Sequence, residues 1–221
     1  TTTFTANGNF TGTIADKSTG MEKANAYVKA IVVTENLVYN GTAQELIKSG
    51  SAEGGEILYS VTENGTYTSD VITGINAGDY EVWYKVTGDS NHNDVAPAKI
   101  NVSIAKASVT IPTVSGKVYN GSLQTAEISD TEYYTVSENN GGTNSGRYDV
   151  KLALKDSANY YWEGKAEDVS EVTVDFNISS AANEWTTDPG IAGWTYGESA
   201  NAPEYGAKFG DVKVEYKKAD E

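Results

Sequence analysis

NAGDYEVWYKV at residues 76–86 and NSGRYDVKLAL at residues 144–154 are the two stretches that decide the fold. In both, apolar side chains occupy every second position and mostly polar side chains lie between them. Alternation with a period of two predicts a strand with one buried face and one wet face, as in antiparallel sheets. The predicted buried faces consist of Tyr80, Val82, Tyr84 and Val86 in the first stretch and Tyr148, Val150, Leu152 and Leu154 in the second.

A tyrosine stands two residues after a glycine in both stretches, where each predicted strand begins. Tyr80 follows Gly78, and Tyr148 follows Gly146. A tyrosine at such a corner can bury its ring and return its hydroxyl to nearby backbone, like the tyrosine corner of Greek-key sandwiches. We therefore predict structural roles for these two tyrosines and two glycines.

The same landmarks recur on both sides of these stretches and in the same order. LVYNGTAQ at 37–44 comes before the first stretch, and KVYNGSLQ at 117–124 before the second; KINVSIAK at 99–106 and EVTVDFNI at 171–178 come after them. Recurrence in a fixed order predicts tandem repeats. Each YNG string predicts a turn with a positive φ angle at its glycine. The residues assigned to these turns are Asn40, Gly41, Asn120 and Gly121.

Incomplete copies of the landmarks stand at both ends of the chain. WTYGESAN at 194–201 matches the start of a repeat, and GNFTGT at 8–13 resembles NYYWEG at 159–164, which comes late in a repeat. Repeats would then join with almost no linker, so neighbouring repeats are expected partners. The predicted pieces are a repeat tail at 1–24, whole repeats at 25–107 and 108–182, and a repeat head at 183–221.

Composition narrows the classes of protein to which the chain can belong. Its 221 residues include no Cys and give a formal net charge of -15. An acidic chain repels nucleic acid and anionic lipid, which argues against both as partners. No stretch approaches the roughly 18 apolar residues of a membrane span, so no membrane insertion is expected. Without disulfides, stability has to come from packing or from other cross-links, such as Lys–Asn isopeptide bonds.

The landmarks together resemble bacterial Ig-like repeats of the MBG type, which occur in large adhesin-like surface proteins. The resemblance rests on YNGTAQ, AEGG and NAGDYEVWYKVTGDSNHND, and on an alternating strand that ends in IAKA; it is strongest over 37–107 and weaker over 108–181. It implies an all-β chain of tandem Ig-like Greek-key β-sandwich domains in an elongated rod. It further implies an extracellular location, on a bacterial cell surface or cell wall, and brings no catalytic residues.

The loop GDSNHND at 88–94 is a candidate for a catalytic or metal site. It holds the one histidine of the chain, His92, and no nucleophile motif accompanies it. Zinc needs several His or Cys ligands, which the sequence lacks. Two interpretations remain for Asp89, Asn91, Asn93 and Asp94, a weak calcium site or a capped turn. We predict no catalytic residues, no metal site and no cofactor.

Outward aromatic side chains are the candidate ligand contacts. Alternation places Trp83 on the wet face of its strand, because it stands between inward residues. Exposed aromatics can stack on sugars or anchor a protein partner, although they also pack across strands on a wet face. The predicted ligand contacts are Trp83, Tyr59, Tyr67, Tyr160, Tyr161 and Trp162.

Three functional hypotheses follow from these features. The first is a non-catalytic stalk or spacer made of stacked repeats. The second is a module that binds host glycan, glycoprotein or immunoglobulin through the outward aromatics. The third is head-to-tail self-association, in which the head at 183–221 and the tail at 1–24 of successive chains complete one sandwich.

Overall fold

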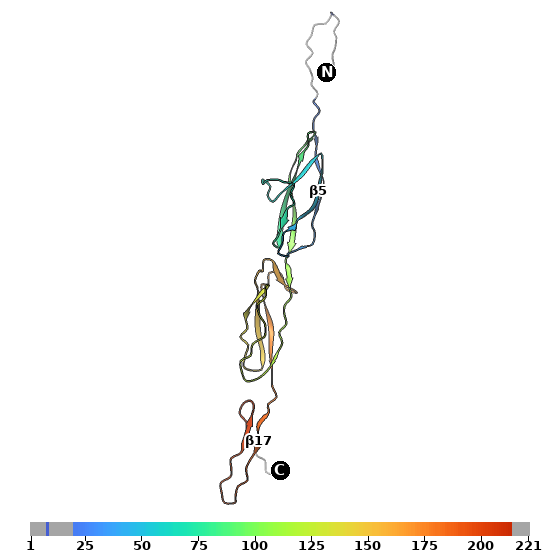
Figure 1. The fold of residues 1–221 in the computed structure, drawn as a ribbon. Helices are drawn as coiled ribbons and strands as arrows, with labels where there is room; N and C mark the ends of the chain where they lie inside the picture. Colours follow the sequence, from blue (N-terminus) through green and yellow to red (C-terminus); the bar gives the residue numbers. More distant parts are fainter. Residues whose placement is uncertain (1–7, 9–19, 214–221) are drawn as a thin grey trace. The chain divides into compact units, whose positions relative to one another are not determined.

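The computed structural model describes Gly8 and residues 20–213, and the chain is all-β within them (Figure 1). About 49% of the residues lie in strands, and the described residues contain no helix. The chain divides into two compact units, unit 1 from Thr1 to Ala105 and unit 2 from Lys106 to Glu221. Most of the predicted repeat tail at 1–24 lies outside the described residues. None of the described residues form a helix long and apolar enough to cross a membrane.

The described part of unit 1 contains one four-stranded sheet and three strand pairs. The four-stranded sheet has the order β3-β10-β8-β6, and the pairs are β1-β9, β2-β5 and β4-β7. Strand β8 is antiparallel to both of its neighbours, whereas β3 runs parallel to β10 and β1 runs parallel to β9. The strands are β1 (Ala24–Asn25), β2 (Tyr27–Val33), β3 (Leu37–Val38), β4 (Gln44–Glu45), β5 (Ile47–Glu53), β6 (Gly55–Ser60), β7 (Thr73–Gly74), β8 (Gly78–Gly88), β9 (His92–Asn93) and β10 (Val95–Ala105).

Unit 2 repeats the four-stranded sheet with the order β12-β16-β14-β13, in which β12 runs parallel to β16. Strand β11 runs parallel to β15, as β1 does to β9. The β2-β5 pair of unit 1 has no strand counterpart, because residues 110–116 and 125–133 lie outside strands. The strands are β11 (Ala107–Val109), β12 (Lys117–Val118), β13 (Tyr134–Glu138), β14 (Gly146–Leu154), β15 (Tyr160–Trp162), β16 (Glu171–Ser179), β17 (Trp185–Gly190) and β18 (Glu204–Ala207).

The predicted alternation of the two central strands is confirmed. In β8, Val82 and Val86 are 0% exposed, and in β14 the same holds for Val150 and Leu152. The residues directly before and after each of these four are intermediate or exposed. Each fully buried aliphatic side chain of this kind stabilises the fold by about 1.5–3 kcal/mol.

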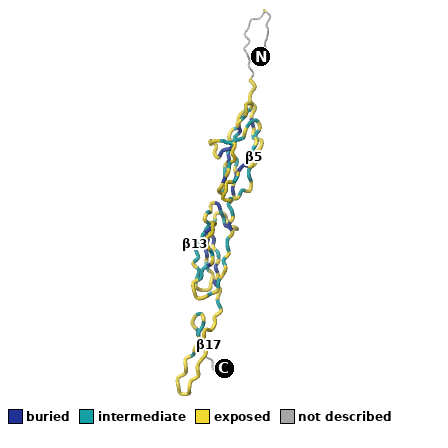
Figure 2. Tube along the Cα trace, viewed as in Figure 1, coloured by how far each residue is buried: buried dark blue, intermediate teal, exposed yellow. Residues whose placement is uncertain are grey.

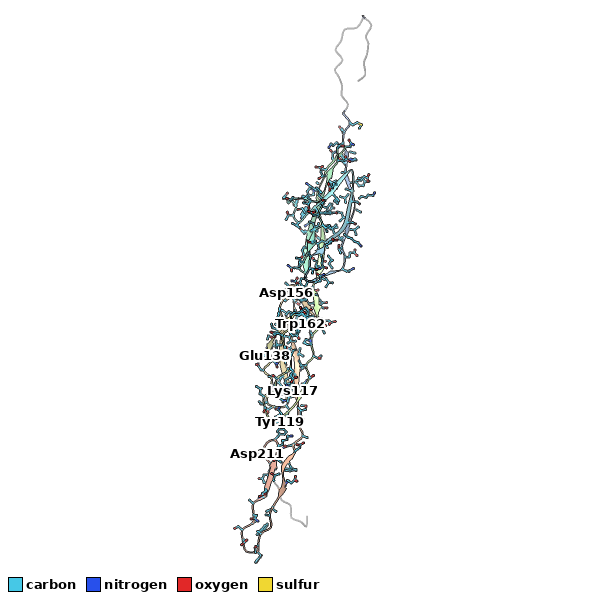
Figure 3. The ribbon with its side chains drawn as sticks, in the orientation of Figure 1. Lys117, Tyr119, Glu138, Asp156, Trp162 and Asp211 are labelled. Atoms are coloured by element: carbon cyan, nitrogen blue, oxygen red, sulfur yellow. The ribbon has the colours of Figure 1, made fainter. Side chains whose placement is uncertain are left out.

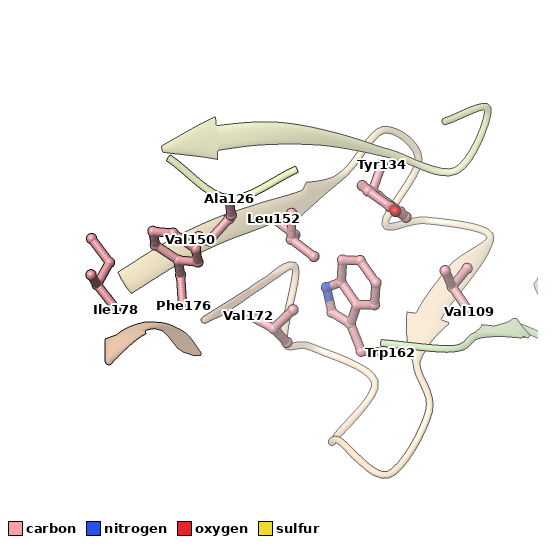
Figure 4. Close-up of a cluster of buried hydrophobic side chains, with 9 residues drawn as sticks. All are labelled: Val109, Ala126, Tyr134, Val150, Leu152, Trp162, Val172, Phe176 and Ile178. Carbon is pink, nitrogen blue, oxygen red and sulfur yellow. The ribbon is translucent and has the colours of Figure 1, made fainter. Parts of the chain in front are cut away.

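Each unit has its own hydrophobic core. In unit 1 the buried core residues are Leu46, Ile47, Tyr59, Val82, Val102 and Ile104. In unit 2 they are Val109, Ala126, Tyr134, Val150, Leu152, Trp162, Val172, Phe176 and Ile178 (Figure 4). Trp162 and Phe176, both 0% exposed, fill the volume between the sheet and the segments outside it.

The segment from 183 to 213 forms an antiparallel pair of β17 and β18. It is almost entirely exposed (Figure 2). Trp185 is 51% exposed, Trp194 50%, and Tyr196 fully exposed. Its pairing matches that of β2 with β5 in unit 1, and the described residues after β18 contain no strand.

Candidate functional site

The two predicted corner tyrosines make the same hydrogen bond in both units. The Tyr80 hydroxyl donates to the carbonyl oxygen of Asn76 at 2.7 Å, and the Tyr148 hydroxyl donates to that of Asn144 at 2.9 Å. Gly78 and Gly146 are the first residues of β8 and β14, so each tyrosine lies at the start of its strand. The hydroxyl therefore ties the turn to the strand that follows it.

Each corner tyrosine covers a glycine that sequence reasoning missed. A Cβ atom on Gly74 would lie 2.7 Å from Cζ of Tyr80, and one on Gly142 would lie 2.0 Å from Cζ of Tyr148. Both glycines stand six residues before their tyrosine, and this shared spacing is the signal that could have found them. A side chain at either glycine would occupy the space of the ring.

The YNG strings pair with the end of β10 in unit 1 and with the end of β16 in unit 2. The backbone N–H of Tyr39 donates to the carbonyl of Ala105 at 2.8 Å, and that of Tyr119 (Figure 3) donates to the carbonyl of Ser179, also at 2.8 Å. The chain then turns at glycines with φ angles of 76° at Gly41 and 81° at Gly121. These angles lie in the left-handed region that glycine adopts without a steric penalty.

Side chains of the same strings hold these turns in place. The Asn40 Oδ1 atom accepts from the N–H of Thr42, and Asn120 Oδ1 accepts from the N–H of Ser122, both at 2.9 Å. Two glutamines donate back to the strand before the turn, Gln44 to the Val38 carbonyl and Gln124 to the Val118 carbonyl, both at 3.1 Å. We call the set of Tyr39, Asn40, Gly41 and Gln44 in unit 1, and of Tyr119, Asn120, Gly121 and Gln124 in unit 2, the end lock.

The end lock and the tyrosine corner are joined through backbone pairing. Gln44 pairs with Gly74 in the β4-β7 ladder, and Gln124 pairs with Gly142 in an isolated antiparallel bridge. The glycine under each corner ring is thus the partner of the glutamine of the end lock. The residues shared by the two units therefore build one continuous structural element in each.

The loop at 88–94 uses its polar groups for local hydrogen bonds. Asp89 Oδ1 accepts from the N–H of Asn91 at 2.8 Å and lies 2.7 Å from Nδ1 of His92. Asp94 Oδ1 accepts from the N–H of Gly88 at 2.8 Å. The oxygens that could have served calcium thus cap the turn. Within Gly8 and residues 20–213, no group of three or more His, Cys, Asp or Glu side chains is placed to hold a metal ion.

Two hydrogen bonds lower the pKa of Asp89, and the bond from His92 has a larger effect than the bond from the N–H of Asn91. A carboxyl group whose pKa is lower in the folded state contributes stability above its unfolded pKa, and this contribution disappears as the pH falls through the folded pKa. We expect Asp89→Asn to destabilise unit 1 at neutral pH, and the difference from the unchanged chain to vanish in acid. Urea unfolding over a pH series measures this, with Asp70→Asn, at an exposed carboxylate, as control. A difference that is constant with pH would contradict the prediction.

One face of unit 1 carries the outward aromatics. Trp83 is partly exposed, and the Lys99 ammonium lies 5.8 Å from the centroid of its ring. Lys85 lies 4.8 Å from the ring centroid of Tyr67, whose hydroxyl donates to the carbonyl of Glu63. We call Trp83, Lys85, Lys99 and Tyr67 the aromatic face.

Unit 2 has a different surface at the matching position. Lys151 occupies the place of Trp83, and its Nζ atom lies 2.6 Å from Oε2 of Glu138. This contact lowers the pKa of Glu138 and raises that of Lys151. The aromatic face is therefore a property of unit 1 only, among the described residues.

Two of the six predicted ligand contacts are core residues, so this part of the prediction is wrong. Tyr59 is 7% exposed and Trp162 is 0% exposed. Tyr59 stands opposite Tyr84 on the core face of the sheet, while its neighbour Ser60 stands opposite Trp83. Tyr160 packs against the core of unit 2. Tyr161 is partly exposed in the short strand β15.

The Tyr59 hydroxyl is buried and has no hydrogen-bond partner among the residues that the structure describes, and burial raises its pKa. An unsatisfied buried hydroxyl costs about 1–3 kcal/mol. We therefore expect Tyr59→Phe to leave the free energy of unfolding unchanged or to raise it by about 1 kcal/mol. Tyr80→Phe and Tyr148→Phe, which remove a donor from a made bond, should each lower it by about 1 kcal/mol. Urea unfolding of the three variants tests this, and a clear loss for Tyr59→Phe would contradict it.

A shallow cavity of about 330 Å³ lies beside Tyr59 in unit 1, lined in part by Lys48, Ser49 and Glu56. Of the six predicted ligand contacts, Tyr59 alone is among the residues that line this cavity, and Tyr59 belongs to the core. Comparison with family models, with curated proteins and with solved structures finds no match for this chain.

Proposed function

We propose that this chain is a non-catalytic stalk or spacer of a bacterial surface protein, built from Ig-like Greek-key sandwich repeats of the MBG type. In this proposal the units follow one another in series and form an elongated rod. The stability of such an array is approximately the sum of the stabilities of its units and of the contacts between neighbours.

The observation that carries the proposal is the identical use of the shared residues in both units. The end lock joins the first part of unit 1 to β10 and that of unit 2 to β16, and the tyrosine corner fixes the start of the central strand. These residues act on the backbone of their own unit. The residues that recur in both units therefore stabilise the fold of each unit. This fits a spacer, whose role is to span a distance.

Small-angle X-ray scattering of the full chain tests the rod. A compact protein of this length would have a radius of gyration of about 17 Å. The proposal predicts a value at least about twice as large, with a long tail in the distance distribution, since folded units in series extend far beyond a sphere. A radius of gyration close to that of the compact protein would overturn it.

A second candidate function is glycan binding at the aromatic face. A partly exposed tryptophan with Lys99 beside its ring, and a tyrosine with Lys85 beside its ring, offer surfaces for stacking a sugar and donors for its hydroxyl or carboxylate groups. The Lys99 ammonium also pairs with Glu81, which keeps donor and acceptor groups together beside the ring.

A glycan array with the full chain distinguishes the two functions. Binding that is lost in Trp83→Ala and retained in Trp185→Ala, a change at an exposed tryptophan elsewhere, supports the glycan-binding module. Absence of binding, or binding unaffected by Trp83→Ala, rejects this candidate and leaves the spacer.

The exposed segment from 183 to 213 favours a third candidate, self-association. Its β17-β18 pair leaves Trp185, Trp194 and Tyr196 in solvent, and such a pair can gain stability from strands of another chain. Light scattering over a concentration series tests this. A mass that rises with concentration supports it, and a monomer at all concentrations rejects it.

A further inference from the structure

The first part of unit 1 runs alongside its last part and in the same direction. Ala24 of β1 stands opposite His92 of β9, and Leu37 of β3 stands opposite Ile104 of β10. Both pairings are parallel. The segment from 24 to 39 is therefore attached to the segment from 91 to 105 at both of its ends.

Backbone hydrogen bonds close each of these attachments. At the first, the N–H of Ala24 donates to the Asn91 carbonyl at 3.0 Å, and at the second the N–H of Tyr39 donates to the Ala105 carbonyl at 2.8 Å. A side-chain bond from Asn93 Nδ2 to Asn25 Oδ1 at 3.0 Å supports the first attachment. The glutamine of the end lock supports the second.

Unit 2 has the same arrangement. Ala107 stands opposite Tyr160 in the parallel pair of β11 and β15, and Lys117 stands opposite Ile178 in the parallel pair of β12 and β16. The Lys106 ammonium donates to the carbonyls of Ser157 and Glu167, at 2.8 and 2.9 Å, beside the first of these pairs. Both units thus attach their first segment to their last by parallel pairing at two places.

Parallel pairing decides how a unit responds to a pull on its two ends. The chain enters each four-stranded arrangement at the start of the first segment and leaves it at the end of β10 in unit 1 and of β16 in unit 2. A pull would draw these two segments past each other in opposite directions, so the hydrogen bonds between them are strained together. An antiparallel pair pulled at its open end, by contrast, loses its bonds one after another.

We propose that each unit resists unfolding when the chain is stretched, because the stretching force loads its two parallel attachments in shear. This inference deepens the proposed spacer function and rests on it. It assigns to the end lock the task of keeping the chain folded under tension, because that set of residues closes the second attachment in both units.

Single-molecule stretching of the full chain tests the inference. The chain has no Cys, so introduced cysteines give unambiguous attachment points. With handles at the two chain ends, units 1 and 2 should unfold in separate steps of about 240 Å and about 220 Å, from the extended length per residue.

A second attachment geometry changes the direction of load on unit 1 only. Ile75 is 48% exposed and lies just before β8, whose first residue, Gly78, stands opposite Ile104 at the end of β10. With handles at Ile75→Cys and the C-terminal end, unit 1 is peeled at the open end of the β8-β10 pair. Unit 2 is still stretched from end to end and serves as the internal control.

In this geometry unit 1 should lengthen by a step of about 100 Å. The force should be no more than about half of that in the first geometry, because the hydrogen bonds of an antiparallel ladder then break one after another. The force for unit 2 should stay the same. Equal forces for unit 1 in the two geometries would overturn the proposed shear loading of the parallel attachments. The two units would still unfold independently, so the spacer function would not be contradicted. Failure to see separate steps in the first geometry would instead overturn the independent units on which the spacer rests.

Discussion

Trp162→Ala is expected to lower the free energy of unfolding of unit 2 by about 3–5 kcal/mol, the usual loss for a buried tryptophan. Trp162 is fully buried, its ring centroid lies 5.6 Å from that of Tyr134, and its Nε1 atom donates to the carbonyl of Ser170 at 3.2 Å. Loss of the side chain leaves a cavity and removes one of the two hydrogen bonds that the Ser170 carbonyl accepts, the other coming from the N–H of Leu154 at 2.9 Å. Amide hydrogen exchange measures the protection of each unit separately and should show the loss in residues 106–182.

Trp185→Ala is the control for this change, because it removes the same side chain from an exposed position. We expect it to leave protection in both units within about 0.5 kcal/mol of the unchanged chain. A small effect of Trp162→Ala would mean that this side chain is a surface residue, as the sequence suggested, and would contradict the core described above.

Gly142→Ala should destabilise unit 2 by about 3 kcal/mol, at the upper end of the usual cost of overpacking. Its Cβ atom would lie within 2.2 Å of three atoms of the Tyr148 side chain, two of the ring and the hydroxyl oxygen. The ring cannot retreat without breaking its hydroxyl bond to Asn144 or opening the bridge between Gly142 and Gln124. Urea unfolding followed by circular dichroism measures the loss.

Gly193→Ala is the matched control in the same unit, since no atom of the described residues lies within 4 Å of the Cβ position there. It should change stability by less than about 0.5 kcal/mol. If both variants were equally stable, the tyrosine corner would not hold the turn in the way described.

Local patterns in the sequence predicted the elements whose geometry is set by neighbouring residues. The alternation in β8 and β14 identified their buried faces, and the Asn-Gly pairs at 40–41 and 120–121 identified turns whose glycines have positive φ angles. Each of these features depends on a few consecutive residues. For the same reason, an all-β chain was predictable, because its long strands carry the period-two pattern.

Features that depend on register were not predictable in the same way. Tyr59 and Ser60 are neighbours, and a shift of pairing by one residue exchanges which of them lies beside Trp83. The structure pairs Ser60 with Trp83, so Tyr59 enters the core. Trp162 is one of three consecutive aromatics, and nothing local distinguishes it from Tyr161, which faces the other side of β15.

Pairings between distant segments were likewise absent from the sequence reasoning. The attachment of β3 to β10 and of β12 to β16 joins the two ends of each unit, and no local pattern announces a parallel pair that is two residues long. Gly74 and Gly142 matter only because a tyrosine ring lies over them. The aromatic face contains two of the predicted ligand contacts, Trp83 and Tyr67. It also contains Lys85 and Lys99, which the sequence did not predict there.

Each unit is expected to fold without the other, because each has its own core and its own end lock. Two-dimensional amide NMR of separate fragments, 20–106 and 106–182, compared with the full chain, tests it most directly. We predict dispersed spectra for both fragments that overlay on the corresponding signals of the full chain, except near the cut ends. Collapsed spectra for either fragment, with dispersion only in the full chain, would contradict it.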